Sequence, residues 1–187
     1  AASLHSMISL IRMICSGEVD GGLVVGAEAA ISQFGNPSFA GQGALGNGLP
    51  YHVDRNGFVM GEGAAALVLV NAELLQRLGL KPLAKITGYA ATSDASQDGA
   101  MTAPNPEGAC HSMMNALEMA ELSLGNVDLV KTHGTATKDG DISEITALGL
   151  VAEEQNAPMP DVMSIKSYFG HLLGAAGIAE IVMVLEM

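Results

Sequence analysis

Two short, uninterrupted apolar runs constrain the fold of this chain most strongly. They are GGLVVGAE at 21–28 and GEGAAALVLV at 61–70. A continuous apolar run of this length is typical of a strand buried on both faces, because a strand with one wet face alternates apolar and polar residues. Helical patterns lie next to both runs, at 2–15 and 71–79. The sequence therefore predicts an α/β protein in which buried strands alternate with helices.

The same alternation continues through the rest of the chain. The length of 187 residues fits one domain. Residues 29–56, rich in Gly, Asn and Pro, are expected to be irregular, and 95–106 is expected to be a loop. The remaining predicted elements are strands at 83–94, 127–134 and 161–167 and helices at 107–122, 139–155 and 172–187.

Charge and hydropathy exclude several classes of partner. The net charge of −12 argues against nucleic acid or an anionic membrane. An acidic protein carrier would also be repelled, unless a basic patch lies on residues outside this sequence. No apolar run approaches the ~20 residues that a transmembrane helix needs, and no signal peptide opens the chain. We expect a cytoplasmic protein with no membrane partner.

The two cysteines and one glycine-rich segment are not expected to have a catalytic or binding function. Cys15 and Cys110 form neither a disulfide framework nor a metal-binding spacing, so each is expected to be a reduced, packed thiol. The segment GQGALG at 41–46 matches the G-x-G-x-x-G pattern of dinucleotide binding. That pattern requires a strand before it and a helix after it, and neither is predicted here, so we interpret it as a loop.

Three residues near predicted strand ends point to chemistry. His133 follows the strand DLVK, Lys166 ends the strand VMSIK, and His171 precedes the last helix. Ligands of α/β proteins bind at the carboxyl ends of strands, so two histidines there could converge on one substrate atom. A single histidine is more often a core or loop residue. Two together, each flanked by glycine, favour a catalytic role.

Glu144 is the candidate partner of the lysine. It lies eleven residues beyond His133, on the predicted helix 139–155. A carboxylate there could meet Lys166 and make burial of the ammonium tolerable. The alternative is that Glu144 and Lys166 are unrelated surface charges.

Four segments together carry a family resemblance. THGTATKDGDISE and SIKSYFGHLLGAAG resemble the paired histidine motifs of the β-ketoacyl synthases, the condensing enzymes of fatty-acid and polyketide synthesis. YHVDRNGFVMGEGAAALVLV resembles their R-D-G-F-V-x-G-E-G-A segment, and VDGGLVVGAEAAIS resembles the strand upstream. The similarity spans essentially the whole chain, in the order of the family.

This resemblance implies a thiolase-like layered α/β/α/β/α fold, incomplete in this chain. Residues 1–80 would end the N-terminal half and 83–187 would begin the C-terminal half. The implied enzyme is a homodimer that takes an acyl group from acyl carrier protein onto a cysteine and condenses it with malonyl-carrier. Its substrates are attached to the phosphopantetheine of acyl carrier protein, and it needs no other cofactor and no metal. His133 and His171 would be the catalytic histidines, with Lys166 ordering the site and Glu144 as its carboxylate partner.

The chain also departs from the family pattern. AASLH would place the family's nucleophilic cysteine immediately before Ala1, where the N-terminus of the first helix would lower the thiol pKa. The Gly-Phe-Gly-Gly-type loop of the family is absent, and the segment 39–58 is shorter than its family counterpart. We expect a fragment that is inactive alone. The alternatives are a non-catalytic chain-length or scaffolding partner, which typically loses a histidine, and thiolase-type chemistry on coenzyme A substrates.

Overall fold

The computed structural model describes residues 2–93 and 104–187. The chain forms two compact units that do not follow chain order. Unit 1 contains the residues up to Asn36 together with Met60–Lys85 and His171–Met187. Unit 2 contains Pro37–Val59 and Ile86–Gly170. A short helix, α2 (Gly35–Gly41), includes the point in the sequence where unit 1 first gives way to unit 2.

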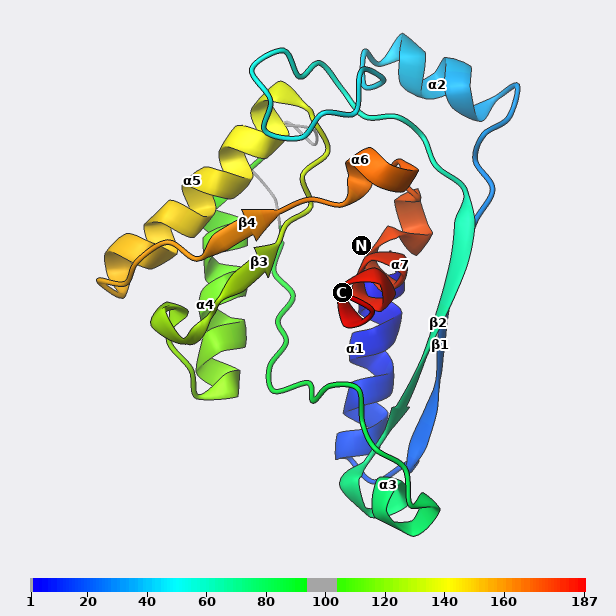
Figure 1. The fold of residues 1–187 in the computed structure, drawn as a ribbon, viewed down its shortest axis with the longest axis vertical. Coiled ribbons are helices and arrows are strands. Elements are labelled where there is room, and N and C mark those ends of the chain that lie inside the picture. The colour runs from blue at the N-terminus through cyan, green and yellow to red at the C-terminus, as the bar shows by residue number, and fades with distance from the viewer. Residues whose placement is uncertain (1, 94–103) are drawn as a thin grey trace. The chain divides into compact units, whose positions relative to one another are not determined.

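Unit 1 is a two-stranded antiparallel sheet with helices on one face. The strands pair in register from Gly21 with Val70 to Glu28 with Gly63. Helices α1 and α7 pack against these strands and against each other (Figure 1). The elements of this unit are α1 (Ala2–Cys15), β1 (Gly21–Glu28), β2 (Gly63–Val70), α3 (Ala72–Leu78), η2 (Leu173–Ala175) and α7 (Ala176–Leu185).

Glycines allow the layers of unit 1 to approach closely. A Cβ added at Gly26 in β1 would lie 3.1 Å from the Cα of Ala175. One added at Gly177 in α7 would lie 2.5 Å from Cγ of Leu4 in α1. Both separations are shorter than an ordinary carbon–carbon contact of about 3.5–4.0 Å. Gly26 therefore sets the spacing between β1 and the segment LLGAAG at 172–177, and Gly177 sets the spacing between α7 and α1.

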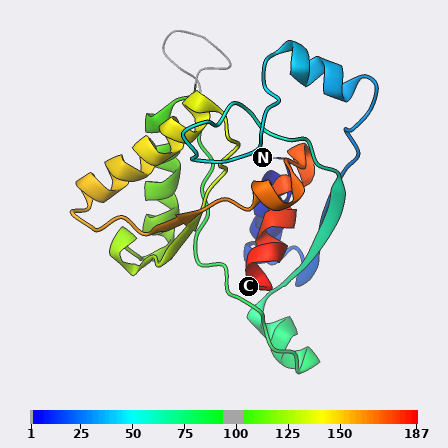
Figure 2. The ribbon, with the colours of Figure 1, turned by 45° about the horizontal axis from the view of Figure 1, so that its top comes forward.

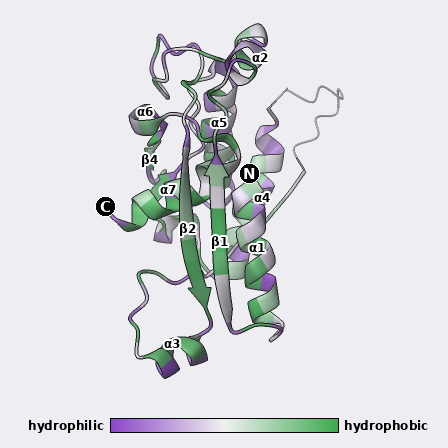
Figure 3. Cartoon of the chain, turned by 90° about the vertical axis from the view of Figure 1, so that its right-hand side faces the viewer, coloured by the Kyte–Doolittle hydropathy of each residue, from purple (hydrophilic) through white to green (hydrophobic). Residues whose placement is uncertain are grey.

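The two faces of the β1–β2 sheet differ in burial. Val24 on the helix-covered face is 3% exposed, whereas the cross-strand pair Leu23 and Val68 on the opposite face is 61% and 70% exposed. Figure 3 shows the apolar colouring of both strands. The expectation that these strands are buried on both faces is therefore wrong for this chain. Successive side chains point to opposite faces, and α1 and α7 cover only one of them.

Unit 2 combines a parallel strand pair with two packed helices. Strands β3 and β4 pair from Leu129 with Asp161 to Lys131 with Met163. Helices α4 and α5 lie side by side in both views (Figures 1 and 2). Their contact includes a buried cluster of Cys110, Leu124, Ala147, Leu148, Val151 and Ala152. The elements of this unit are α4 (Pro106–Ala120), η1 (Leu124–Asn126), β3 (Leu129–Lys131), α5 (Lys138–Glu154), β4 (Asp161–Met163) and α6 (Lys166–Phe169).

The α/β class and all five predicted helices are confirmed, with ends displaced by a few residues. The helix predicted at 71–79 has clear end signals. Asn71 caps its first turn by accepting from the N–H of Leu74, and Gly79 ends it in the left-handed region at φ 65°. The last predicted helix begins as the 3₁₀ turn η2 before α7. The segment 41–46 begins at the last residue of α2 and continues as a turn and an isolated bridge at Leu45, so the loop interpretation is confirmed beyond Gly41.

Three local predictions are wrong. Residues 83–93 belong to no strand in the described chain, and residue 94 lies outside it. Helix α2 forms within the segment expected to be irregular. Lys166 begins α6 instead of ending a strand, because the hydroxyl of Ser164 bonds the carbonyl of Gly134 and the chain turns there. Most of the loop predicted at 95–106 lies outside the described residues.

Two further observations concern binding and the thiols. Of the helices in the described part of the chain, none has both the length and the apolar character that crossing a bilayer requires. Within residues 2–93 and 104–187, no three His, Cys, Asp or Glu side chains are arranged to hold a metal ion. Cys110 is buried, as expected, but Cys15 is exposed at the end of α1, so its predicted packing is wrong.

Candidate functional site

His133 lies in unit 2, in the loop between β3 and α5. The loop leaves the sheet with a bond from the N–H of Thr132 to the carbonyl of Met163, 2.9 Å long. Gly134 follows with φ 44°, and a Cβ there would lie 2.5 Å from Cβ of Ser164. Only glycine fits this position, since both the backbone conformation and the space disfavour a side chain.

Glu144 holds this loop from helix α5. Its Oε1 accepts a hydrogen bond from the N–H of His133, and its Oε2 accepts one of 2.9 Å from the N–H of Gly134. A carboxylate that accepts two adjacent backbone N–H groups fixes the position of that peptide. Glu144 thus sets the main chain from which the His133 ring projects.

Lys166 holds the same residue from the other side. It is only 4% exposed, and its Nζ donates to the carbonyl of His133 at 2.6 Å. The ion pair predicted between Lys166 and Glu144 is not part of the network seen in the described residues. The two side chains are instead linked through His133, which Glu144 holds by its N–H and Lys166 by its carbonyl.

The lysine also defines the proton position on the imidazole. Nζ lies 3.4 Å from Nδ1 of His133. An ammonium can only donate, so Nδ1 is the acceptor and the neutral ring carries its proton on Nε2. His133 is exposed in this chain.

Asp141 is a site residue that sequence reasoning missed. It is 2% exposed, and it accepts bonds from the N–H of Tyr51 at 2.8 Å and of Ala136 at 3.1 Å. Both of those residues are left-handed, with φ of 63° and 62°. The signal was the three-residue spacing between Asp141 and Glu144, which places two carboxylates on one face of a helix.

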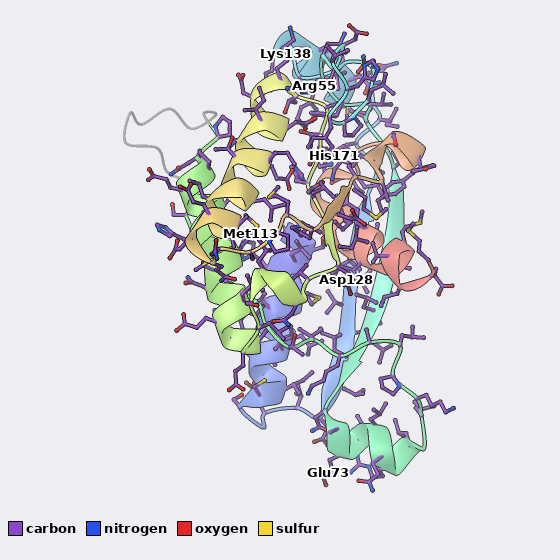
Figure 4. The ribbon with its side chains drawn as sticks, turned by 60° about the vertical axis from the view of Figure 1, so that its left-hand side comes forward. Arg55, Glu73, Met113, Asp128, Lys138 and His171 are labelled. Carbon is purple, nitrogen blue, oxygen red and sulfur yellow. The ribbon has the colours of Figure 1, made fainter. Side chains whose placement is uncertain are left out.

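Arg55 ties a second loop to the beginning of α5. Its guanidinium donates to the carbonyl of Lys138 at 3.1 Å, and its Nε lies 3.6 Å from the Asp141 carboxylate. Figure 4 shows Arg55 and Lys138 together at the end of this helix. The first turns of α5 thereby organise the loop of His133 and the loop that contains Tyr51.

His171 belongs to unit 1 and has its own supports. Its carbonyl accepts a bond of 3.0 Å from the N–H of Gly61, and residue 171 forms a parallel bridge with Met60. Its Nδ1 accepts a bond of 3.1 Å from the N–H of Leu173. The neutral His171 ring therefore also carries its proton on Nε2. The structure thus brings His133, Lys166 and Glu144 together in unit 2. His171, labelled in Figure 4, belongs to unit 1.

Unit 2 also contains a cavity of about 360 Å³ between α4 and α5. It is lined by Glu107, Cys110, His111, Leu150, Glu153 and Glu154. Burial, and then the negative charge of Glu154, raises the pKa of the Cys110 thiol. This thiol stays protonated at neutral pH and is a poor nucleophile.

Sequence and structure comparisons give consistent relatives. The chain is 33% identical over 187 residues to the 3-oxoacyl-[acyl-carrier-protein] synthase 2 of Vibrio cholerae, and the alignment covers 95% of this chain and 44% of that protein. The chain therefore spans less than half the length of this curated relative.

Two solved structures share the fold. The ketosynthase from module 6 of the bacillaene synthase of Bacillus subtilis matches with a TM-score of 0.91 at 28% identity, over 99% of this chain and 34% of that chain. A ketosynthase bound to a hexaketide, in complex with its type II polyketide synthase acyl-carrier protein, matches with a TM-score of 0.88 at 27% identity, over 98% of this chain and 47% of that chain. The predicted thiolase-like fold is thereby confirmed.

Family models complete the assignment. The N-terminal domain of the β-ketoacyl synthases matches residues 1–74, and the C-terminal domain of the same family matches residues 83–187. Together with the shared fold and the histidine motifs, these matches show that the chain belongs to the β-ketoacyl synthase family.

Proposed function

We propose that the full-length protein is a β-ketoacyl-acyl-carrier-protein synthase. An acyl group is held as a thioester on a cysteine of the whole protein. Malonyl-carrier loses carbon dioxide as its C–C bond breaks, and the electron pair forms an enolate. The enolate carbon attacks the acyl carbonyl, the cysteine thiolate leaves, and a β-ketoacyl-carrier is released.

The observation that carries this proposal is the state of the two imidazoles. In each, Nδ1 is an acceptor, towards Lys166 in one case and towards the N–H of Leu173 in the other. In our proposal, each neutral ring donates from Nε2–H to the substrate. Such donors stabilise the negative charge that develops on a thioester oxygen during decarboxylation. Our proposal is that His133 and His171 both donate to this oxygen.

Lys166 and Glu144 have positioning roles in this scheme. Glu144 fixes the N–H side of His133, and Lys166 fixes its carbonyl side. A neutral ring with a fixed tautomer is preorganised for donation, which lowers the reorganisation needed when charge develops.

The partner in this proposal is acyl carrier protein, which presents both substrates on phosphopantetheine. A structural relative in complex with its acyl-carrier protein supports this choice. We further propose that the whole protein is a cytoplasmic homodimer with a role in fatty-acid or polyketide synthesis, and that residues 1–80 and 83–187 belong to the two halves of its ketosynthase domain.

The test separates decarboxylation from acyl loading in the full-length protein. His133→Ala and His171→Ala should each slow carbon dioxide release from malonyl-carrier by about 10²–10³-fold, the usual cost of one lost oxyanion donor. Loading of radiolabelled acyl group onto the cysteine should be much less affected. His111→Ala, which removes an exposed imidazole from α4, is the control and should leave both reactions unchanged.

The opposite pattern would overturn the assignment. A histidine variant that fails to load acyl group yet releases carbon dioxide at the normal rate does not support enolate stabilisation by that residue. A wild-type protein that neither loads acyl group nor releases carbon dioxide would refute the proposed function itself.

A further inference from the structure

The loop of residues 51–55 in unit 2 contacts Glu144 through Tyr51, a residue to which the proposed mechanism assigns no role. The hydroxyl of Tyr51 donates to Oε2 of Glu144 at 3.1 Å. The same oxygen accepts the bond from the N–H of Gly134, while Oε1 accepts from the N–H of His133. Glu144 therefore has three donors, two from the main chain of the histidine loop and one from Tyr51.

The position of Tyr51 is determined independently of its side chain. Its N–H donates to Oδ2 of Asp141 at 2.8 Å, and its φ is 63°. An aromatic residue in the left-handed region is strained and persists only where its surroundings hold it. Asp141 provides that restraint, and it also holds the left-handed Ala136 in the loop of His133.

The Tyr51 hydroxyl keeps its proton and can therefore always donate a hydrogen bond to Glu144. Burial is the main cause that raises the pKa of Tyr51, and the Glu144 and Asp141 carboxylates act in the same direction against a hydrogen bond with Thr132. The hydroxyl consequently stays protonated at neutral pH. It can donate to the carboxylate under all conditions in which a condensing enzyme would work.

We propose that Tyr51 is a positioning residue for His133 that acts through Glu144. The proposal rests on the function proposed above. The phenol restricts the Glu144 carboxylate to the orientation in which both oxygens meet the N–H groups of His133 and Gly134. The backbone of Tyr51, held by Asp141, connects this restraint to the first turns of α5. Tyr51 contacts no reacting atom in this scheme, so its effect depends on the presence of the carboxylate.

The test is a double-mutant cycle in the full-length protein, with malonyl-carrier decarboxylation as the assay. Tyr51→Phe keeps the ring and removes the donor. We expect kcat to fall about tenfold, the effect of losing one hydrogen bond to a charged group, with KM unchanged. Glu144→Gln should cost more. Because the hydroxyl acts through the carboxylate, Tyr51→Phe should add almost nothing in the Glu144→Gln background.

The matched control is Tyr168→Phe, whose side chain is 82% exposed and whose activity should equal that of the wild type. Wild-type kcat in Tyr51→Phe would overturn the inference. So would a tenfold loss that is repeated in full in the Glu144→Gln background, because it would show that the phenol acts by another route.

A second measurement does not depend on catalysis. Amide hydrogen exchange at His133 and Gly134 reports how firmly Glu144 holds the two N–H groups. Exchange at these amides should be faster in Tyr51→Phe than in wild type and unchanged in Tyr168→Phe. Unchanged exchange in Tyr51→Phe would overturn the inference. Faster exchange in a protein without condensing activity would support the positioning role while refuting the proposed function.

Discussion

The helix-and-sheet layer of unit 1 and the histidine loop of unit 2 are built by different forces. In the first, Gly26 of β1 packs closely against Ala175 of η2. Gly177 of α7 packs closely against Leu4 of α1, and the nearest atoms in both contacts are carbons. In the second, Asp141 and Glu144 hold two loops through directed hydrogen bonds. Apolar contact is non-directional and tolerates small shifts, whereas a carboxylate bond requires its donor in one place.

This difference shows how the molecule separates scaffold from function. The close-packed layer sets the distance between helices and strands but specifies no ring orientation. The hydrogen-bonded network fixes the main chain and the tautomer of His133, which the catalytic role that we propose for this residue requires. We therefore expect substitutions in the network to disturb both stability and chemistry, and substitutions in the layer to act through packing alone. Three experiments test this contrast.

The largest effect is expected from Asp141→Ala. The change leaves two backbone N–H groups and the Arg55 guanidinium without their buried carboxylate. Removing one partner from a buried charged pair typically costs about 3–5 kcal/mol of stability. Urea denaturation of the full-length protein measures this loss. The control is Asp139→Ala, an exposed carboxylate in the same helical turn, for which we expect less than about 1 kcal/mol. Equal losses in both variants would show that the network adds nothing special.

A pair of helix glycines tests the apolar layer. A Cβ at Gly177 meets Leu4 at 2.5 Å, so Gly177→Ala should cost about 1–2 kcal/mol net of the helix propensity it gains. A Cβ at Gly149 in α5 meets nothing within 4 Å, so Gly149→Ala should stabilise the protein by about 0.5–1 kcal/mol. Thermal denaturation should show a lower melting temperature for Gly177→Ala and a higher one for Gly149→Ala than for the wild type. Stabilisation by Gly177→Ala would mean that α1 can move away at no cost.

The smallest effect concerns the two thiols. Cys15 is exposed and Cys110 is buried, so at pH 8 iodoacetamide should label Cys15 first and Cys110 only after denaturation. The pKa of Cys110 is raised in the folded state by burial and by Glu154. Its contribution to stability is therefore complete below the unfolded thiol pKa of about 8.5 and is lost as pH rises above that value.

Comparison with Cys110→Ala isolates this contribution. The variant should lose less stability than the wild type between about pH 8 and pH 10, below the ordinary titration of tyrosine. The midpoints of urea denaturation, measured for both proteins across this pH range, give the difference in stability. Identical pH profiles for the two proteins would contradict the raised pKa.

The sequence alone predicted the class, the helices and the family. Periodicity placed the helix at 71–79 because Asn71 and Gly79 are local end signals that need no distant contact. The strands at 21–28 and 61–70 were also predicted from local sequence, because each is a continuous apolar run. The motifs around His133 and His171 identified the family because they combine several residues at fixed spacing.

The tertiary structure decided the features that depend on residues distant in the chain. The exposed face of β1–β2 follows from which elements cover it, which a local apolar run does not reveal. The role of Glu144 was predicted as an ion pair with Lys166, but its acceptor geometry selects the N–H groups of His133 and Gly134. Tyr51 lies more than 90 residues from Glu144 in the sequence. Hydrogen bonds are short and directional, so only the folded backbone determines which donor reaches which oxygen.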